Sequence, residues 1–145
     1  MRIRVTGILV RDGKVLMVEC YDPVNGPHLN FPGGGLDPGE TLIEGVTREV
    51  KEECCVDVRP GRLLTVTEHW DGEEMETLCF AFEVEETTEK NPSMPSVPDL
   101  YQTGVGWYSW EELDTHKVLP PILRAVKAAI EGRPSSYAGA MKLLK

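Results

Sequence analysis

Residues 34–56 read GGLDPGETLIEGVTREVKEECCV, and this stretch is the most informative part of the chain. It begins with a glycine-rich segment, and from Thr41 onward apolar residues recur every four positions. That period is typical of one face of an amphipathic helix, and a threonine just before it is a common N-cap. The stretch therefore predicts a glycine-rich loop followed by a helix. The recurring apolar residues are Leu42, Val46, Val50 and Cys54.

Three carboxylates of this helix, those of Glu49, Glu52 and Glu53, are spaced i, i+3 and i+4. At about 100° per residue they project into one sector of the helix. Like charges this close destabilise a helix unless a cation compensates them, and carboxylate oxygens suit Mg²⁺ or Mn²⁺. A solvated glutamate-rich face is the alternative when the three are taken alone. The neighbouring glycines and Arg48 favour a metal site.

The residues around the carboxylates support that interpretation. Arg48 is one residue before Glu49 and four before Glu52, so its guanidinium can orient Glu52 or a neighbouring carboxylate by paired hydrogen bonds. Residues 33–35 are all glycine, which lets the backbone approach a metal ion or a phosphate closely. Glu40 is placed at the start of the helix, where its carboxylate favours the positive end of the macrodipole and can tie down the loop.

The stretch resembles the signature of the Nudix hydrolases: Gly, five residues, Glu, seven residues, then Arg-Glu-aliphatic-x-Glu-Glu-x-Gly-aliphatic. The matching positions are Gly34, Glu40, Arg48, Glu49, Val50, Glu52, Glu53 and Val56. The one departure is Cys55, which stands where the family has glycine, so the turn at the helix end can be built differently there. The resemblance implies an α/β fold, the Nudix-type α/β/α sandwich with a mixed sheet between helices.

The same resemblance implies a Mg²⁺-dependent (or Mn²⁺-dependent) hydrolase that cleaves the diphosphate linkage of a nucleoside diphosphate derivative. By resemblance, the metal ligands are the carbonyl of Gly33 and the side chains of Glu49, Glu52 and Glu53. These glutamates and Arg48 are the expected catalytic residues, and Gly34 and Gly35 are expected to contact the substrate. Which glutamate, or which more distant acid, activates the attacking water stays open. The loop around residues 85–102 contains further acids for that role, namely Glu85, Glu86, Glu89 and Asp99, although a solvated carboxylate is the alternative for each.

Substrate choice depends on residues outside the signature. ADP-ribose pyrophosphatases often carry a proline shortly after it, whereas this chain has none between Gly61 and Asn91. Dinucleoside polyphosphate hydrolases tend to carry a tyrosine in that region, and the first one here is Tyr101. A nucleoside triphosphate or a related nucleotide is therefore the expected substrate. The alternatives are an ADP-ribose or nucleotide-sugar pyrophosphatase and a Nudix-fold sensor without catalysis, which would usually have lost the glutamates.

Residues near the expected loop and strand ends are candidates for contacts with the nucleoside. Tyr21 and Asn30 precede the glycine segment, and Trp70, beside His69, closes the strand after the helix, where an aromatic ring can stack on a base. Structural packing is the alternative for each of them. An isopentenyl-diphosphate isomerase, which shares the fold, would be expected to carry additional metal-binding histidines.

Composition limits the partners further. The chain has 15 Lys and Arg against 24 Asp and Glu, a formal net charge of −9, so duplex nucleic acid is not an expected partner. An acidic protein that binds phosphates needs a bridging cation. The cysteines show no CxxC spacing, and the N-terminus has no signal-peptide pattern. No apolar run is long enough for a membrane span, so a cytoplasmic location is expected.

The length of 145 residues fits one domain, which we place at residues 1–134. The tail, residues 135–145, is short and of mixed character. It is either a flexible end or part of a contact between two copies of the chain in a homodimer. The sequence leaves both alternatives open.

Overall fold

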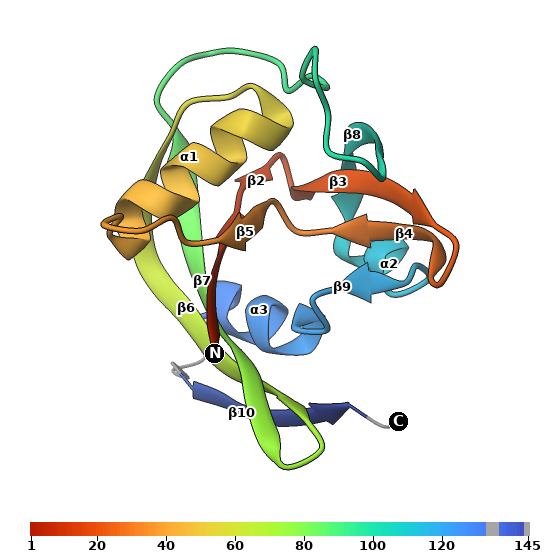
Figure 1. Cartoon of the computed structure of the whole chain (residues 1–145). Coiled ribbons are helices and arrows are strands. Elements are labelled where there is room, and N and C mark those ends of the chain that lie inside the picture. The colour runs from red at the N-terminus through yellow and green to blue at the C-terminus, as the bar shows by residue number, and fades with distance from the viewer. Residues whose placement is uncertain (133–136, 144–145) are drawn as a thin grey trace.

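The computed structural model describes residues 1–132 and 137–143 and consists of two β-sheets and three helices (Figure 1). The strands are β1 (Arg2–Ile8), β2 (Val10–Arg11), β3 (Lys14–Asp22), β4 (Gly26–Asn30), β5 (Gly33–Gly35), β6 (Val58–Asp71), β7 (Glu74–Glu86), β8 (Gln102–Ser109), β9 (Val118–Leu119) and β10 (Tyr137–Leu143). The helices are α1 (Leu42–Cys54), α2 (Trp110–Leu113) and α3 (Leu123–Ile130).

The first sheet is mixed and has the strand order β10-β6-β7-β1-β5. Strands β1 and β7 run parallel, as do β10 and β6, whereas β6 pairs antiparallel with β7 and β1 antiparallel with β5. The second sheet contains β2, β3, β4 and β9, with β8 added along β3. The two-residue turn between β2 and β3 has positive φ at both Asp12 and Gly13, as a tight hairpin requires.

Helices α1 and α3 lie on opposite faces of the mixed sheet, which Figure 1 shows as the layer between them. Each helix has its own apolar core. Val46 and Val50 of α1 pack with residues of β1, β3 and β7, while Val126 and Ala129 of α3 pack with residues of β6 and β7 on the other face. Burying each of these valines contributes roughly 1.5–3 kcal/mol. The predicted α/β/α sandwich is therefore confirmed.

The ends of α1 are defined by its sequence. Thr41 is the N-cap: its side chain accepts a hydrogen bond from the N–H of Glu44, whose carboxylate accepts one from the N–H of Thr41. At the other end Cys55 has φ 59° and ψ 31°, the left-handed conformation that favours glycine. Its N–H donates to the carbonyl of Lys51. Cys55 therefore replaces the glycine of the signature but adopts the same left-handed backbone conformation that a glycine would favour at the helix end.

Some elements differ from the expectations. Part of the predicted glycine loop is strand β5, because the absence of a side chain at Gly33 lets it pair with β1: a Cβ there would lie 2.2 Å from the carbonyl oxygen of Val5. Strand β6 continues through Pro60 and Gly61 with an irregular register. The short elements α2 and β9 were not predicted.

Residues 137–143 of the expected tail form β10, which pairs with β6 along Val66 to Asp71. The tail residues 135, 136, 144 and 145 lie outside the described residues. Within the described part of the chain, no helix has the length and apolar character needed to cross a membrane.

Candidate active site

Two glutamates of α1 lie directly against the glycine segment. Glu53 Oε1 accepts a hydrogen bond from the backbone N–H of Gly33 at 2.7 Å. A Cβ at Gly34 would lie 2.6 Å from Glu49 Oε1, so the absence of a side chain lets this carboxylate approach the strand. Strand β1 holds the segment in place, with Val5 opposite Gly34. The predicted loop and the predicted acidic helix face therefore meet.

Arg48 lies at the centre of the acidic side chains. Its Nε and Nη2 donate to the two oxygens of Glu40 at 2.7 and 2.9 Å. Its Nη1 donates to Glu49 Oε1 at 2.9 Å and to Glu52 Oε2 at 3.2 Å, and Nη2 also donates to the carbonyl of Gly35 at 3.1 Å. The paired hydrogen bonds thus run to Glu40, while Glu49 and Glu52 receive single ones. The hydrogen bonds that Arg48 donates to Glu40 raise the pKa of Arg48 above its ordinary value.

Glu40 ties the segment between β5 and α1 to the helix. It precedes the N-cap Thr41 and so lies outside the helix. Its Oε1 accepts hydrogen bonds from Arg48 and from the N–H of Asp37. The hydrogen bonds from Arg48 hold the pKa of the Glu40 carboxyl below its usual range. The expectation that Glu40 ties down the loop is confirmed.

The three glutamates differ in exposure, and burial raises the pKa of two of them, Glu49 and Glu53. Glu53 is 7% exposed, and burial raises its pKa to about 8, with the charge of Glu49 acting in the same direction against the opposing N–H of Gly33. Burial also raises the pKa of Glu49, whose side chain is 12% exposed. The Glu52 side chain is 58% exposed. Two carboxylates are thus held where a positive charge would stabilise their ionised forms.

The carboxylates form an all-oxygen donor set, the kind that Mg²⁺ and Mn²⁺ prefer. Their arrangement is not that of a closed ligand cluster: among residues 1–132 and 137–143, no three His, Cys, Asp or Glu side chains are grouped to hold an ion. Arg48 Nη1 donates one hydrogen bond to Glu49 and one to Glu52. The oxygen donors and the buried carboxylate beside Gly33 fit a divalent cation.

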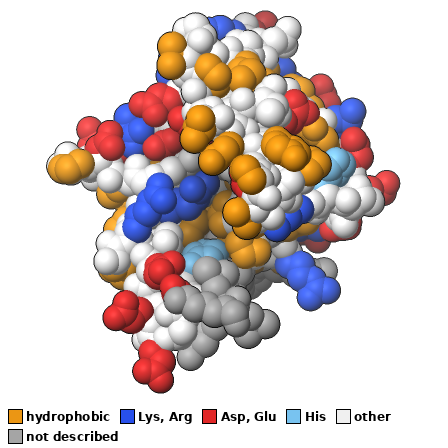
Figure 2. All heavy atoms as spheres, turned by 45° about the vertical axis from the view of Figure 1, so that its right-hand side comes forward, with side chains coloured by type: hydrophobic (Ala, Val, Ile, Leu, Met, Phe, Trp, Pro, Cys, Tyr) orange, Lys and Arg blue, Asp and Glu red, His pale blue; other side chains and the backbone are white. Residues whose placement is uncertain are grey.

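A cavity of about 360 Å³ opens between the two sheets, and the glutamates of α1 are not among its lining residues. Arg2 and Arg4 of β1 lie on one wall, and Asn30 of β4 lies on the facing wall. Arg4 is opposite Gly35 in the strand pairing, so the cavity begins where the glycine segment ends. Figure 2 shows basic side chains gathered beside a histidine in a recess of this face.

The residues expected to contact the nucleoside are not all at this cavity. Asn30 lines it, as does His69. Trp70 is outside the lining residues, and its indole N–H donates to Glu68 Oε1. Tyr21 is also outside them and is 57% exposed, with its backbone N–H bound to the carbonyl of Tyr101. The contacts of Tyr21 and Trp70 with substrate stay predictions.

Two residues near the site, Arg4 and Gln102, were not singled out from the sequence as site residues, whereas Asp99 was named there as a candidate acid. Arg4 lies close enough to Glu53 and Glu49 for its charge to lower the pKa of both. Gln102 is buried, and its Nε2 donates to the backbone carbonyl of Glu53 at 2.9 Å. The charge of Asp99 helps to raise the pKa of Glu53. The alternation of Arg2 and Arg4 along the first strand is the sequence feature that could have identified Arg4.

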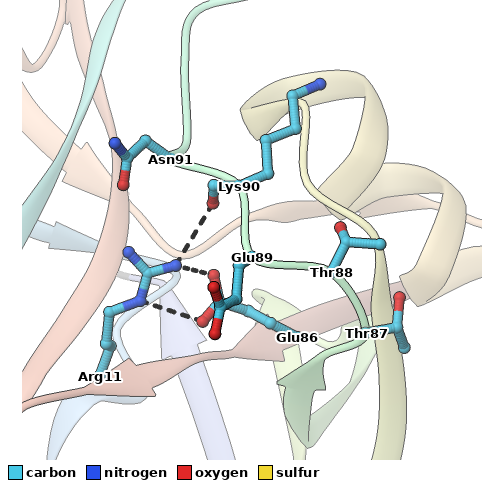
Figure 3. Close-up of a pocket in the computed structure, with 7 residues that line it drawn as sticks. All are labelled: Arg11, Glu86, Thr87, Thr88, Glu89, Lys90 and Asn91. Atoms are coloured by element: carbon cyan, nitrogen blue, oxygen red, sulfur yellow. Dashed lines mark hydrogen bonds and ion pairs between the residues drawn. The ribbon is translucent and has the colours of Figure 1, made fainter.

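A second hollow, at Arg11, has different chemistry (Figure 3). It is formed by Arg11 and residues 86–91, and the Arg11 guanidinium already binds the carboxylate of Glu86 and the carbonyl of Lys90. Its guanidinium also lies 4.7 Å from the ring centre of Trp107. Arg11 in this hollow is therefore already paired with a carboxylate, and Lys90 is the second cation that lines it.

Comparisons with known proteins agree with this arrangement. A family model described as the NUDIX domain matches residues 1–129. The chain is 30% identical over 112 residues to the protein named Phosphatase NudJ of Escherichia coli, which covers 77% of this chain and 70% of the relative.

Solved structures show the same fold. A NUDIX hydrolase from Nitrosomonas europaea superposes with a TM-score of 0.78 at 18% identity, covering 98% of this chain and 79% of the other. An ADP-ribose pyrophosphatase from Streptococcus suis superposes with a TM-score of 0.69 at 16% identity, covering 96% of this chain and 97% of the other.

Proposed function

The chain belongs to the Nudix hydrolase family, and on that premise we propose that it cleaves the diphosphate linkage of a nucleoside triphosphate or a related nucleotide with the help of Mg²⁺ or Mn²⁺. The observation that carries the proposal is the meeting of the acidic face of α1 with the glycine segment, where Glu53 binds the N–H of Gly33 and Glu49 lies against Gly34. The cavity between the sheets, where Arg2 and Arg4 adjoin Gly35, offers room for the rest of the substrate.

Glu49, Glu52 and Glu53 would hold the cation, together with the carbonyl of Gly33. When bound, a divalent cation neutralises charge on the phosphate oxygens and lowers the pKa of a coordinated water. Burial of Glu53 and Glu49 raises their pKa values, so both carboxylates gain most from a nearby positive charge. A net charge of −9 is compatible with a phosphorylated substrate once a cation offsets the carboxylates.

The chain's own residues divide the remaining tasks. Arg48 holds Glu49 and Glu52 by single hydrogen bonds and is itself fixed by Glu40, so it positions two of the proposed ligands. Glu52 is the most exposed of the three glutamates and can pass a proton to solvent, which suits the base that activates the attacking water. Gly34 and Gly35 present backbone where the phosphates would lie.

The signature glutamates are all present, which favours catalysis over the sensor alternative. An ADP-ribose or nucleotide-sugar pyrophosphatase remains the second substrate class, and one relative in fold is named as such. The absence of a proline between Gly61 and Asn91 argues for the triphosphate.

The test is hydrolysis of a panel of diphosphate compounds, with products identified by phosphorus NMR. The panel includes nucleoside triphosphates, ADP-ribose and a nucleotide sugar, each with Mg²⁺ or with EDTA. We expect Mg²⁺-dependent cleavage of a phosphorus anhydride by the native protein, with large losses in Glu52→Gln and Glu53→Gln. Glu73→Gln, an exposed change in the β6–β7 turn, is the matched control and should retain activity. Turnover that survives EDTA, or that both site variants retain, would exclude the proposal.

A further inference from the structure

Three buried polar atoms belong to side chains that line the cavity between the sheets and have no hydrogen-bond partner among the described residues. They are Arg4 Nε, Asn30 Oδ1 and His69 Nε2. Buried polar groups are nearly always paired in folded proteins, and exceptions gathered at one cavity point to a ligand. The three come from three different strands, β1, β4 and β6, so the fold brings them together from distant parts of the chain.

The amide of Asn30 has a defined orientation. Its Nδ2 donates to Cys20 Sγ at 3.4 Å, while Cys20 Sγ donates toward the carbonyl of Val18 at 3.9 Å. Burial raises the pKa of the Cys20 thiol to about 11, so the sulfur keeps its proton for that contact. The sulfur can therefore accept from Asn30. Asn30 Oδ1 remains as an acceptor, which requires a hydrogen-bond donor on the ligand.

Arg4 and Arg2 supply donors on the opposite wall. Within residues 1–132 and 137–143, neither forms an ion pair with a carboxylate, in contrast to Arg11, Arg48 and Arg59. Arg4 is opposite Gly35 on one side and Cys79 on the other, and its side chain lines the cavity.

His69 is on the same wall as the arginines. It is opposite Thr77 in the β6–β7 pairing, and Thr77 is opposite Arg2 in the β7–β1 pairing, so the three form one row across the sheet. Burial lowers the pKa of His69, with the charge of Arg4 acting in the same direction. The imidazole of His69 is therefore neutral near pH 7. In this form one ring nitrogen is a hydrogen-bond donor and the other is an acceptor.

We infer that this cavity binds the nucleobase of the substrate, with Asn30 accepting a hydrogen bond from the base, Arg4 donating one to it and His69 completing the contact. The inference rests on the proposed function, because it assigns the non-reacting part of the same substrate. It also makes Asn30, Arg4 and His69 the residues that determine specificity.

The chemistry of the three atoms favours a base over the other parts of a nucleotide. An ionised phosphate has only acceptors and would face Asn30 Oδ1 without a donor to offer. A heterocycle carries a donor and an acceptor on one rigid edge, which matches a fixed acceptor and a fixed donor across the cavity. A volume of about 360 Å³ accommodates such a ring. A sugar hydroxyl can also donate and accept, so the test must separate sugar from base.

The test is calorimetric binding to the metal-free protein, which needs no turnover. The probes are the four common nucleoside 5′-monophosphates and ribose 5-phosphate, which has the same sugar and phosphate but no base. We expect at least one nucleotide to bind tenfold or more tightly than ribose 5-phosphate. Asn30→Leu should reduce that preference to less than threefold. Asn91→Leu, the same change at the Arg11 hollow, should leave it unchanged.

A measurement on the native protein covers the case in which Asn30→Leu does not fold. With ¹⁵N-labelled protein, the preferred nucleotide should shift the Arg4 Nε–H and His69 ring signals, and ribose 5-phosphate should leave the His69 signals in place. Equal affinity for nucleotide and ribose 5-phosphate would overturn the inference, as would unchanged His69 signals. Hydrolysis could persist in either case, so this failure is distinguishable from failure of the proposed function.

Discussion

Glu53 of helix α1 accepts a hydrogen bond from the backbone N–H of Gly33 in strand β5 at 2.7 Å. This contact joins the two parts of the signature across 20 residues of sequence and holds a carboxylate in a position that is 7% exposed. Burying a carboxylate without a cation favours its protonated form. Burial of the ionised Glu53 carboxylate is therefore unfavourable, and a nearby divalent cation would stabilise it.

The stability of the metal-free protein should fall as pH rises from about 5 to about 8. The folded-state pKa of Glu53 is raised to about 8, above its ordinary value of 4.5, so the folded protein holds this proton more tightly than the unfolded chain. The stabilisation is complete below the unfolded pKa and is lost as pH approaches 8, by on the order of a few kcal/mol. Urea unfolding in EDTA measures it. Glu53→Gln should remove most of the slope, and an equal slope in that variant would contradict the assignment.

Arg48→Lys should lower both metal affinity and kcat by roughly 10- to 100-fold while the protein stays folded. A lysine cannot make the paired hydrogen bonds to Glu40 and at the same time bind Glu49. Mn²⁺ titration and initial rates provide the two readouts. The control is Arg59→Lys, whose exposed pair with Glu85 lies on the β6–β7 hairpin. Loss of activity with unchanged Mn²⁺ affinity would show that Arg48 does not position the ligands.

Gly34→Ala should abolish most activity, because the new Cβ would lie 2.6 Å from Glu49 Oε1 and force that carboxylate away from the strand. Gly61→Ala is the matched control: it is also in a strand, and the nearest atom to its Cβ would be 3.6 Å away. Rates of the two variants, compared at equal folded fraction by circular dichroism, give the result. Near-native activity in Gly34→Ala would mean that the close approach is not needed.

Cys55→Gly should stabilise the protein by about 1 kcal/mol, because a non-glycine residue in the left-handed conformation carries a cost of that order. Cys55 has φ 59° at the end of α1. Thermal unfolding should show a midpoint higher by about 2–4 °C. Cys55→Ala keeps the Cβ and should show no such gain. A gain in both variants would assign the effect to the sulfur rather than to the backbone.

Much of the fold was predictable because the hydrophobic pattern is local. The helix that Thr41 caps depends on neighbouring residues and was predicted. The extension of the glycine segment into strand β5 depends on β1, which is distant in sequence, so the glycines alone indicated a loop. Strand β10 depends in the same way on its pairing with β6.

The acidic part of the site was predictable for a similar reason, since Glu49, Glu52 and Glu53 share one helix. The sequence did not predict that the paired hydrogen bonds from Arg48 go to Glu40. Glu40 reaches Arg48 only when the loop folds back. The cavity was the least predictable part. Arg4 and His69 come from strands whose register no local pattern reveals.

The central claim is that these carboxylates bind a divalent cation on which hydrolysis depends. The most direct measurement is the initial rate of nucleoside triphosphate hydrolysis as a function of Mg²⁺ concentration, for the native protein and for Glu53→Gln. The account predicts a saturable rise from no activity in EDTA, and in the variant a half-saturating Mg²⁺ concentration at least tenfold higher. Activity independent of Mg²⁺, or the same Mg²⁺ dependence in both proteins, would contradict it.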